Sequence, residues 1–96
     1  MDLQLKEKVA LITGGSQGIG LAVAQALAAE GVHIIITARS EHQIDNAVKE
    51  ISTQYNVNAF GFPADLTKGE DIKDVVSLAL SKFEHIDILI NNAGTG

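Results

Sequence analysis

The sequence predicts an α/β fold: a doubly wound parallel sheet with helices on both faces. Four short apolar runs alternate with three longer segments of helical periodicity, and glycine, proline or polar residues follow each run. Strands that alternate with helices of this length run parallel and are joined by right-handed crossovers. We therefore expect the strand order 3-2-1-4 within one domain over residues 1–96.

The first strand is expected over residues 8–13 (KVALIT), a nearly continuous apolar run of the kind found in strands covered on both faces. The first helix is expected over residues 19–30, followed by Gly31, a residue that favours the left-handed conformation after a helix. Four apolar residues at helical spacing predict its buried stripe: Ile19, Val23, Ala26 and Leu27.

The second strand and helix are expected over residues 32–38 and 40–55, and Ser40 with Gln43 forms a capping-box pattern at the helix start. The apolar stripe of this helix consists of Ile44, Ala47, Val48, Ile51 and Tyr55. The sole tyrosine has no lysine four residues further on, since that position is Ala59, so Tyr55 is interpreted as a packing residue.

The third strand is expected over residues 57–62, ended by Pro63, which has no N–H to donate. Thr67 and Glu70 repeat the capping-box pattern before a third helix. Its stripe consists of Ile72, Val75, Val76, Ala79, Leu80 and Phe83. The fourth strand is expected over residues 86–90, and a polar, glycine-bearing loop follows it at 91–96.

Composition narrows the class of protein. Twelve acidic residues against seven basic ones give a net charge of -5, the wrong sign for a surface that binds nucleic acid or anionic lipid. The absence of cysteine excludes disulfides and thiolate metal sites, and the scattered His33, His42 and His85 predict no metal site and no catalytic role. No run approaches the roughly 18 apolar residues of a membrane span. We expect a cytoplasmic protein.

The glycine-rich segment TGGSQGIG stands between the first strand and the first helix, where a nucleotide-binding turn is expected. Gly14 permits a sharp turn, Gly18 lets backbone N–H groups approach a pyrophosphate, and Gly20 allows close packing of the helix. Gly15 to Gly20 fits a P-loop spacing but continues with Leu21 rather than lysine, which disfavours ATP or GTP. The alternative is a connector without a ligand.

The end of the second strand indicates which dinucleotide would bind. An acidic residue there accepts hydrogen bonds from the ribose 2′-hydroxyl, whereas an arginine accommodates a 2′-phosphate. The sequence has Arg39, its only arginine, followed by Ser40. NADP(H) is therefore favoured over NAD(H). The alternative is a solvated surface arginine at a helix start.

Two further loops reach the same edge of the sheet. Asp65 follows the third strand and can accept a hydrogen bond from an adenine amino group, although it can equally stabilise the turn before the third helix. Asn91 and Asn92 follow the fourth strand, where their amides can bond the neighbouring strand and wall an adenosine pocket. Asparagine is also common in turns for local reasons.

The three motifs together, TGGSQGIG, Asp65-Leu66 and Asn91-Asn92-Ala93-Gly94, resemble the amino-terminal part of the short-chain dehydrogenase/reductase family, a Rossmann-type fold. The similarity is strongest to 3-oxoacyl-carrier-protein reductase-like members. It implies a dinucleotide loop of Gly14, Ser16, Gln17, Gly18, Ile19 and Gly20. It also implies that Arg39 and Ser40 flank the 2′-phosphate, that Asp65 and Leu66 meet adenine, and that Asn91, Asn92, Ala93 and Gly94 support the ribose and the sheet. Many NADP(H)-using relatives have a basic residue where Gln17 stands here.

The resemblance implies an oxidoreductase that transfers hydride between a nicotinamide cofactor and a small carbonyl or secondary alcohol substrate. The serine, tyrosine and lysine that catalyse the family's reaction lie further along the chain, so we expect residues 1–96 to hold no catalytic residue and to be inactive alone. The apolar fourth strand also suits a central position, which indicates part of a longer oxidoreductase. The resemblance implies a homodimer or homotetramer for the full-length protein. The alternatives are a redox-sensing or regulatory dinucleotide-binding module and a small structural protein.

Overall fold

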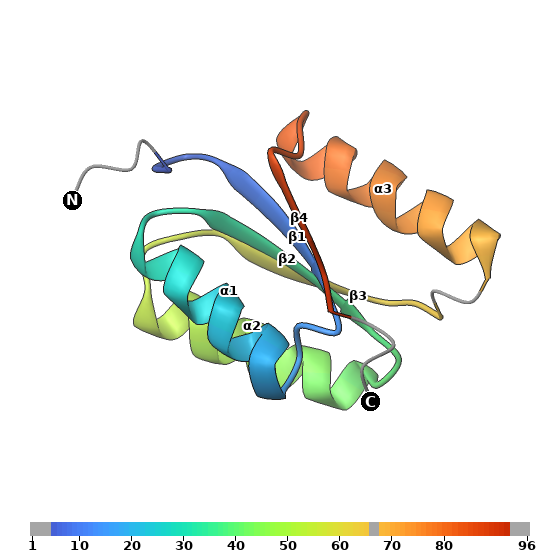
Figure 1. Ribbon diagram of the computed structural model, residues 1–96, viewed down its shortest axis with the longest axis horizontal. Helices are drawn as coiled ribbons and strands as arrows, with labels where there is room; N and C mark the ends of the chain where they lie inside the picture. The colour runs from blue at the N-terminus through green and yellow to red at the C-terminus, as the bar shows by residue number, and fades with distance from the viewer. Residues whose placement is uncertain (1–4, 66–67, 93–96) are drawn as a thin grey trace.

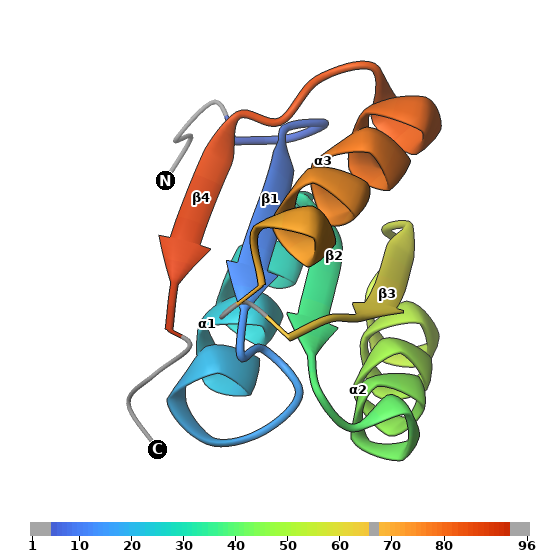
Figure 2. The same cartoon turned by 90° about the vertical axis from the view of Figure 1, so that its right-hand side faces the viewer.

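A computed structural model describes residues 5–65 and 68–92 of the chain. They form the predicted α/β fold, with four parallel strands in the order β3-β2-β1-β4 (Figure 2). The elements are β1 (Val9–Thr13), α1 (Gly18–Ala29), β2 (His33–Ala38), α2 (Glu41–Gln54), β3 (Ala59–Pro63), α3 (Gly69–Phe83) and β4 (Ile88–Asn91).

Helices α1 and α2 cover one face of the sheet and α3 covers the other (Figure 1). Because side chains alternate along a strand, β1 and β2 supply both cores. The core beneath α1 and α2 contains Ala10, Ile12, Ile34, Ile36, Ala24, Ala28, Ile44, Ala47 and Ile51 among its residues. The core beneath α3 contains Val9, Leu11, Ile35, Ala64, Val75 and Ala79. This two-sided burial explains why both strands are apolar runs.

The register of the strands brings their carboxyl ends to one edge of the sheet. Thr13 at the end of β1 is aligned with Thr37 in β2 and with Asn91 at the end of β4. Ala38 at the end of β2 is aligned with Pro63 of β3, which has an edge position and therefore needs no donor on its outer side. Every loop that carries a candidate binding residue leaves the sheet at this edge.

The predicted stripe of α1 is wrong at Ile19 and Ala26, although Leu27 packs against the core as expected. Ile19 is 75% exposed and Ala26 is also exposed, whereas the buried residues of the helix are Gly20, Ala24 and Ala28. The smallest side chains face the sheet because the helix axis approaches the strands closely, and only small residues leave room for that approach. The stripe of α2 was predicted correctly, with Ile44, Ala47 and Ile51 buried and Val48 and Tyr55 partly buried.

The ends of α1 and α2 follow the sequence signals. Gly31 has a φ of +87°, its N–H donates to the Ala28 carbonyl at 3.0 Å, and the Val32 N–H donates to the Leu27 carbonyl at 3.1 Å, the two hydrogen bonds of a Schellman motif. Ser40 precedes α2, and its Oγ accepts a hydrogen bond from the Gln43 N–H at 3.3 Å. Thr67 lies outside the described residues, and α3 begins after Lys68 without a side-chain cap.

Strand β4 is shorter at its start than predicted and includes Asn91. Asp87 precedes it and holds the edge of the sheet: its backbone N–H donates to the Val9 carbonyl at 2.9 Å, and its Oδ2 accepts from the Val9 N–H at 2.9 Å. Among the described residues β4 is an edge strand, and Leu89 is 64% exposed. A neighbour on its outer side stays a prediction.

Within the described ranges, no helix combines the length and apolar character needed to cross a bilayer.

Candidate functional site

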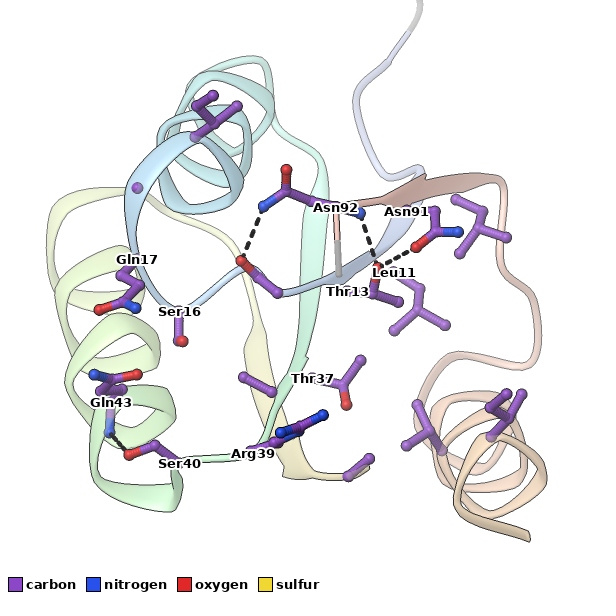
Figure 3. A pocket seen from close by; sticks show the side chains of 18 of the residues that line it. Leu11, Thr13, Ser16, Gln17, Thr37, Arg39, Ser40, Gln43, Asn91 and Asn92 are labelled. Carbon is purple, nitrogen blue, oxygen red and sulfur yellow. Dashed lines mark hydrogen bonds between the residues drawn. The ribbon is translucent and has the colours of Figure 1, made fainter. Parts of the chain in front are cut away.

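A pocket of about 1120 Å³ opens at the carboxyl ends of the strands (Figure 3). It lies where the loop after β1, the start of α2 and the inner side of α3 meet. Its polar lining consists of Thr13, Gly14, Ser16, Gln17, Gly18, Thr37, Arg39, Ser40, Gln43, Asn91 and Asn92. Its apolar lining consists of Leu11, Ile19, Ala38, Ala64, Ile72, Val75, Val76, Ile86 and Leu89.

The loop after β1 presents the start of α1 to this pocket. Gly14 has a φ of +66°, and its N–H donates to the Thr37 carbonyl at 2.7 Å, which fixes the turn to β2. Gly18 has a φ of +60°, and a Cβ built on it contacts nothing within 4 Å, so the backbone there borders open space. Gln17 precedes the helix without a side-chain cap, and the first turn has no acidic residue. The N–H groups of this turn are therefore available to an anion.

Gly20 does not line the pocket, although the resemblance places it in the dinucleotide loop. It is buried in α1, and a Cβ at this position would collide with the Gly14 carbonyl oxygen and stand 2.8 Å from Nδ2 of Asn92. A side chain at position 20 would push the helix away from the glycine turn. Gly20 thus acts on the pocket indirectly, by setting the distance between α1 and the loop.

The two asparagines, the last residue of β4 and the one after it, join the end of β4 to the end of β1 (Figure 3). Oδ1 of Asn91 accepts a hydrogen bond from Oγ1 of Thr13 at 3.0 Å, and the Asn92 N–H donates to the same Oγ1 at 2.9 Å. Nδ2 of Asn92 donates to the Gly14 carbonyl at 3.3 Å. The side-chain amide of Asn92 thus bonds a backbone group directly after β1, as expected, whereas the amide of Asn91 bonds the Thr13 hydroxyl. Ala93 and Gly94 lie outside the described residues.

Arg39 and Ser40 form the corner between β2 and α2. The Arg39 side chain is 77% exposed, and its Nη2 lies 3.9 Å from Oδ1 of Asp65, an ion pair that solvent screens strongly. The Ser40 hydroxyl accepts from the Gln43 N–H and keeps its own proton to donate. Both residues line the pocket, so a guanidinium and a hydroxyl donor face the same space as the start of α1.

Asp65 lies beside the pocket rather than in its wall. Its backbone N–H donates to Oδ2 of Asp71 at 2.8 Å, and its carbonyl accepts from the Lys68 N–H at 2.9 Å. The turn before α3 is therefore held by the Asp65 backbone and by the Asp71 carboxylate, while the Asp65 carboxylate faces Arg39. Its neighbour Ala64 lines the pocket, and Leu66 lies outside the described residues.

Sequence reasoning missed part of the lining. Gln43 lines the pocket and projects from the first turn of α2 toward Gln17 (Figure 3). The sequence indicates only a capping role for Gln43, through the pattern that it forms with Ser40. Ile72 and Val76 stand four residues apart on α3 and were assigned to a buried stripe, but both are exposed at the pocket. Thr37 lies within an apolar strand, and no motif in the sequence singles it out. Because side chains alternate along a strand, Thr37 lies on the same face of the sheet as Ile35, the face that α3 covers.

The histidines have structural contacts outside the pocket. Nδ1 of His33 accepts from the Asn58 N–H at 3.0 Å, so the ring proton is on Nε2, which donates to Glu7 at 3.0 Å. This hydrogen bond lowers the pKa of Glu7. His85 contacts Asp87 at 2.8 Å. Within residues 5–65 and 68–92, no three His, Asp or Glu side chains gather where they could hold a metal ion.

Comparison with known proteins gives consistent matches. The family model for short chain dehydrogenases matches residues 8–96. A fatty acyl-CoA reductase of Acinetobacter baylyi is 42% identical over 90 residues, 94% of this chain and 30% of that protein. A 3-oxoacyl-[acyl-carrier-protein] reductase of Aquifex aeolicus is 38% identical over 94 residues, 98% of this chain and 38% of that protein.

Solved structures match as closely. The crystal structure of L-sorbose reductase from Gluconobacter frateurii, complexed with NADPH and L-sorbose, superposes with a TM-score of 0.96 at 41% identity. The match covers 100% of this chain and 36% of the reductase. The chain thus spans about a third of the length of these relatives.

Proposed function

Since this chain belongs to the short-chain dehydrogenase/reductase family, we propose that it supplies the nicotinamide-dinucleotide site of an oxidoreductase acting on a carbonyl or secondary alcohol. The observation that carries the proposal is the convergence of two donor groups on one pocket. The uncapped first turn of α1 and the Arg39 corner both line it. A dinucleotide with a phosphate on one ribose has two negative groups: its pyrophosphate can bind the first turn of α1, and its ribose phosphate can bind Arg39.

The first turn of α1 suits the pyrophosphate. Its N–H groups have no side-chain cap, Gly18 adds no side chain to the approach, and the helix dipole adds positive potential there. Ser16 and Gln17 line the same stretch and can donate to the phosphate oxygens. The hydrogen bonds of Asn92 and Thr13 hold the loop against β1 and β4, so the backbone donors are positioned before the ligand arrives.

The Arg39 corner favours NADP(H) over NAD(H). Arg39 can pair with a 2′-phosphate, Ser40 can add a hydroxyl donor, and positions 38–40 supply no carboxylate to accept from a free 2′-hydroxyl. Asp65 holds the guanidinium over the corner through a weak, exposed ion pair, which a phosphate can replace. The NADPH bound in L-sorbose reductase supports this choice.

A bound nicotinamide ring would supply or accept the hydride. The residues of this chain bind and orient the dinucleotide: α1 holds its pyrophosphate, Arg39 its ribose phosphate, and Asp65 with Leu66 its adenine. Asn91, Asn92, Ala93 and Gly94 support the ribose from the β4 side. Proton transfer to the substrate oxygen belongs to serine, tyrosine and lysine residues in the remainder of the polypeptide. We expect the whole protein to be a cytoplasmic homodimer or homotetramer.

Titration of the full-length protein with NADPH and NADH by isothermal calorimetry tests the proposal. Arg39→Ala should weaken NADPH binding about tenfold, the loss of one charge-assisted phosphate contact at an exposed site. NADH binding should change less than about twofold, because NADH has no phosphate at that corner. Lys49→Ala removes another exposed cation from α2 and serves as the matched control.

Two results would contradict the proposal. Failure of the wild-type protein to bind either dinucleotide would remove the site altogether. Equal losses of NADPH and NADH affinity on Arg39→Ala would leave the dinucleotide site in place but refute the 2′-phosphate contact.

A further inference from the structure

One hydroxyl at the strand ends has no partner. The Thr37 side chain is completely buried, and within residues 5–65 and 68–92 its Oγ1 is the one buried side-chain nitrogen or oxygen without a hydrogen bond. Buried polar atoms in native proteins are nearly always paired, because an unpaired one loses its hydration without compensation. This atom therefore calls for a physical explanation.

Thr37 belongs to the pocket. It lies two residues after Ile35, whose side chain packs in the core beneath α3, so the two side chains point to the same face of the sheet. Thr37 is among the residues that line the pocket, and its hydroxyl points into the space between Arg39 and α3 (Figure 3). Because no group in the described part of the chain pairs with this hydroxyl, the partner we consider is a ligand that seats against the strand ends.

Thr13 provides the comparison, since it occupies the aligned position on β1. Its Oγ1 donates to Oδ1 of Asn91 at 3.0 Å and accepts from the Asn92 N–H at 2.9 Å. The hydroxyl of Thr13 thus both donates and accepts a hydrogen bond within the protein. The hydroxyl of Thr37, in the aligned position on β2, does neither within the described residues.

We propose that Oγ1 of Thr37 is the hydrogen-bonding group on the pocket floor for the adenine base of the nucleotide; this inference rests on the proposed function. The surroundings of Thr37 select a base over a phosphate. Leu11, Ala64 and Val75 line the pocket and belong to the core beneath α3, on the same face of the sheet as Thr37. This apolar lining suits the faces of a planar ring and penalises a charged group. A hydroxyl both donates and accepts, so it can pair with a ring nitrogen or an exocyclic amine at the edge of the base.

The substitution Thr37→Val tests the inference, because it replaces the hydroxyl by a methyl group of similar size. The full-length variant should have a higher melting temperature without ligand, by about 2–4 °C, since an unpaired buried hydroxyl is removed. It should bind NADPH and 2′,5′-ADP about fivefold more weakly, the usual effect of one lost hydrogen bond. Thr37→Ser retains the hydroxyl and should bind both ligands with nearly wild-type affinity.

Thr13→Val is the matched control, and its melting temperature should fall because it removes the two hydrogen bonds that Oγ1 of Thr13 makes with Oδ1 of Asn91 and with the Asn92 N–H. Unchanged affinity of Thr37→Val for both ligands would overturn the adenine contact while leaving the proposed function intact. Equal losses of affinity in Thr37→Val and Thr37→Ser would also overturn it. Thr37→Ser keeps the hydroxyl, so such a result would mean that the affinity depends on the shape of the side chain and not on its hydroxyl. If the wild-type protein bound neither NADPH nor 2′,5′-ADP, both proposals would fail.

Discussion

Gly20→Ala should destabilise the protein although alanine is the better helix former. Gly20 is the third residue of α1, and in an exposed helix the same change stabilises by about 1 kcal/mol. Here the added Cβ would meet the Gly14 carbonyl and stand 2.8 Å from Nδ2 of Asn92. Neither the backbone carbonyl nor the bonded amide can yield without moving the loop or β4.

The magnitude follows from three contributions. Forcing a methyl group into a filled contact costs about 1–3 kcal/mol. Displacing Asn92 from its 3.3 Å bond to the Gly14 carbonyl adds about 0.5–1.5 kcal/mol. The helix propensity of alanine offsets about 1 kcal/mol of this. We expect a net loss of about 0.5–3.5 kcal/mol in the free energy of unfolding, with weaker dinucleotide binding because the first turn of α1 moves away from the loop.

Urea unfolding of the full-length protein, followed by circular dichroism, measures this loss. Gly69→Ala is the matched control: Gly69 begins α3, and a Cβ there contacts nothing within 4 Å, so this variant should be as stable as wild type or more stable. A Gly20→Ala protein as stable as Gly69→Ala would refute the argument that the helix and the glycine turn are in contact through position 20.

Two further predictions concern the sheet edge and the start of α2. The hydrogen bond from the Val9 N–H lowers the pKa of Asp87 below its ordinary value of 3.8, and the contact with His85 lowers it further, although partial desolvation opposes both. The Asp87 carboxylate therefore stabilises the fold above pH 3.8, and this stabilisation is lost as the pH falls through the folded-state pKa. In urea titrations between about pH 2 and 6, the stability difference between wild type and Asp87→Asn should therefore shrink toward the acid end, and a constant difference would contradict the assignment. Ser40→Ala removes the cap bonded by the Gln43 N–H and should cost about 1 kcal/mol, whereas Ser40→Gly should cost only a few tenths; equal losses in chemical unfolding would argue against the cap.

The strands and their order were predictable because β1 and β2 are buried on both faces. Such strands are apolar runs, and the helices between them force parallel crossovers, so local pattern and topology agree. The cap at Ser40 and the positive φ of Gly31 were also predictable, since each depends on one residue type at one position.

The packed face of α1 was not predictable from hydrophobicity. Periodicity selects the largest apolar residues, such as Ile19, whereas the contact is made by Gly20, Ala24 and Ala28. What decides the orientation is the short distance between helix and sheet, and this distance depends on the glycine turn and on Asn92, more than seventy residues away in the sequence. A pattern within one helix contains no information about that contact.

The pocket is a consequence of the same topology. Chain order reverses at β1, so the connections on its two sides leave for opposite faces of the sheet: α1 lies behind the strands and α3 lies in front (Figure 2). The strand ends between these helices are covered by neither of them. The α1 side leaves uncapped N–H groups, while the α3 side leaves Ile72, Val76 and Leu89 exposed. A ligand with both phosphates and planar rings matches the two halves together, since phosphate alone leaves the apolar half uncovered and an apolar molecule alone leaves the N–H groups unpaired.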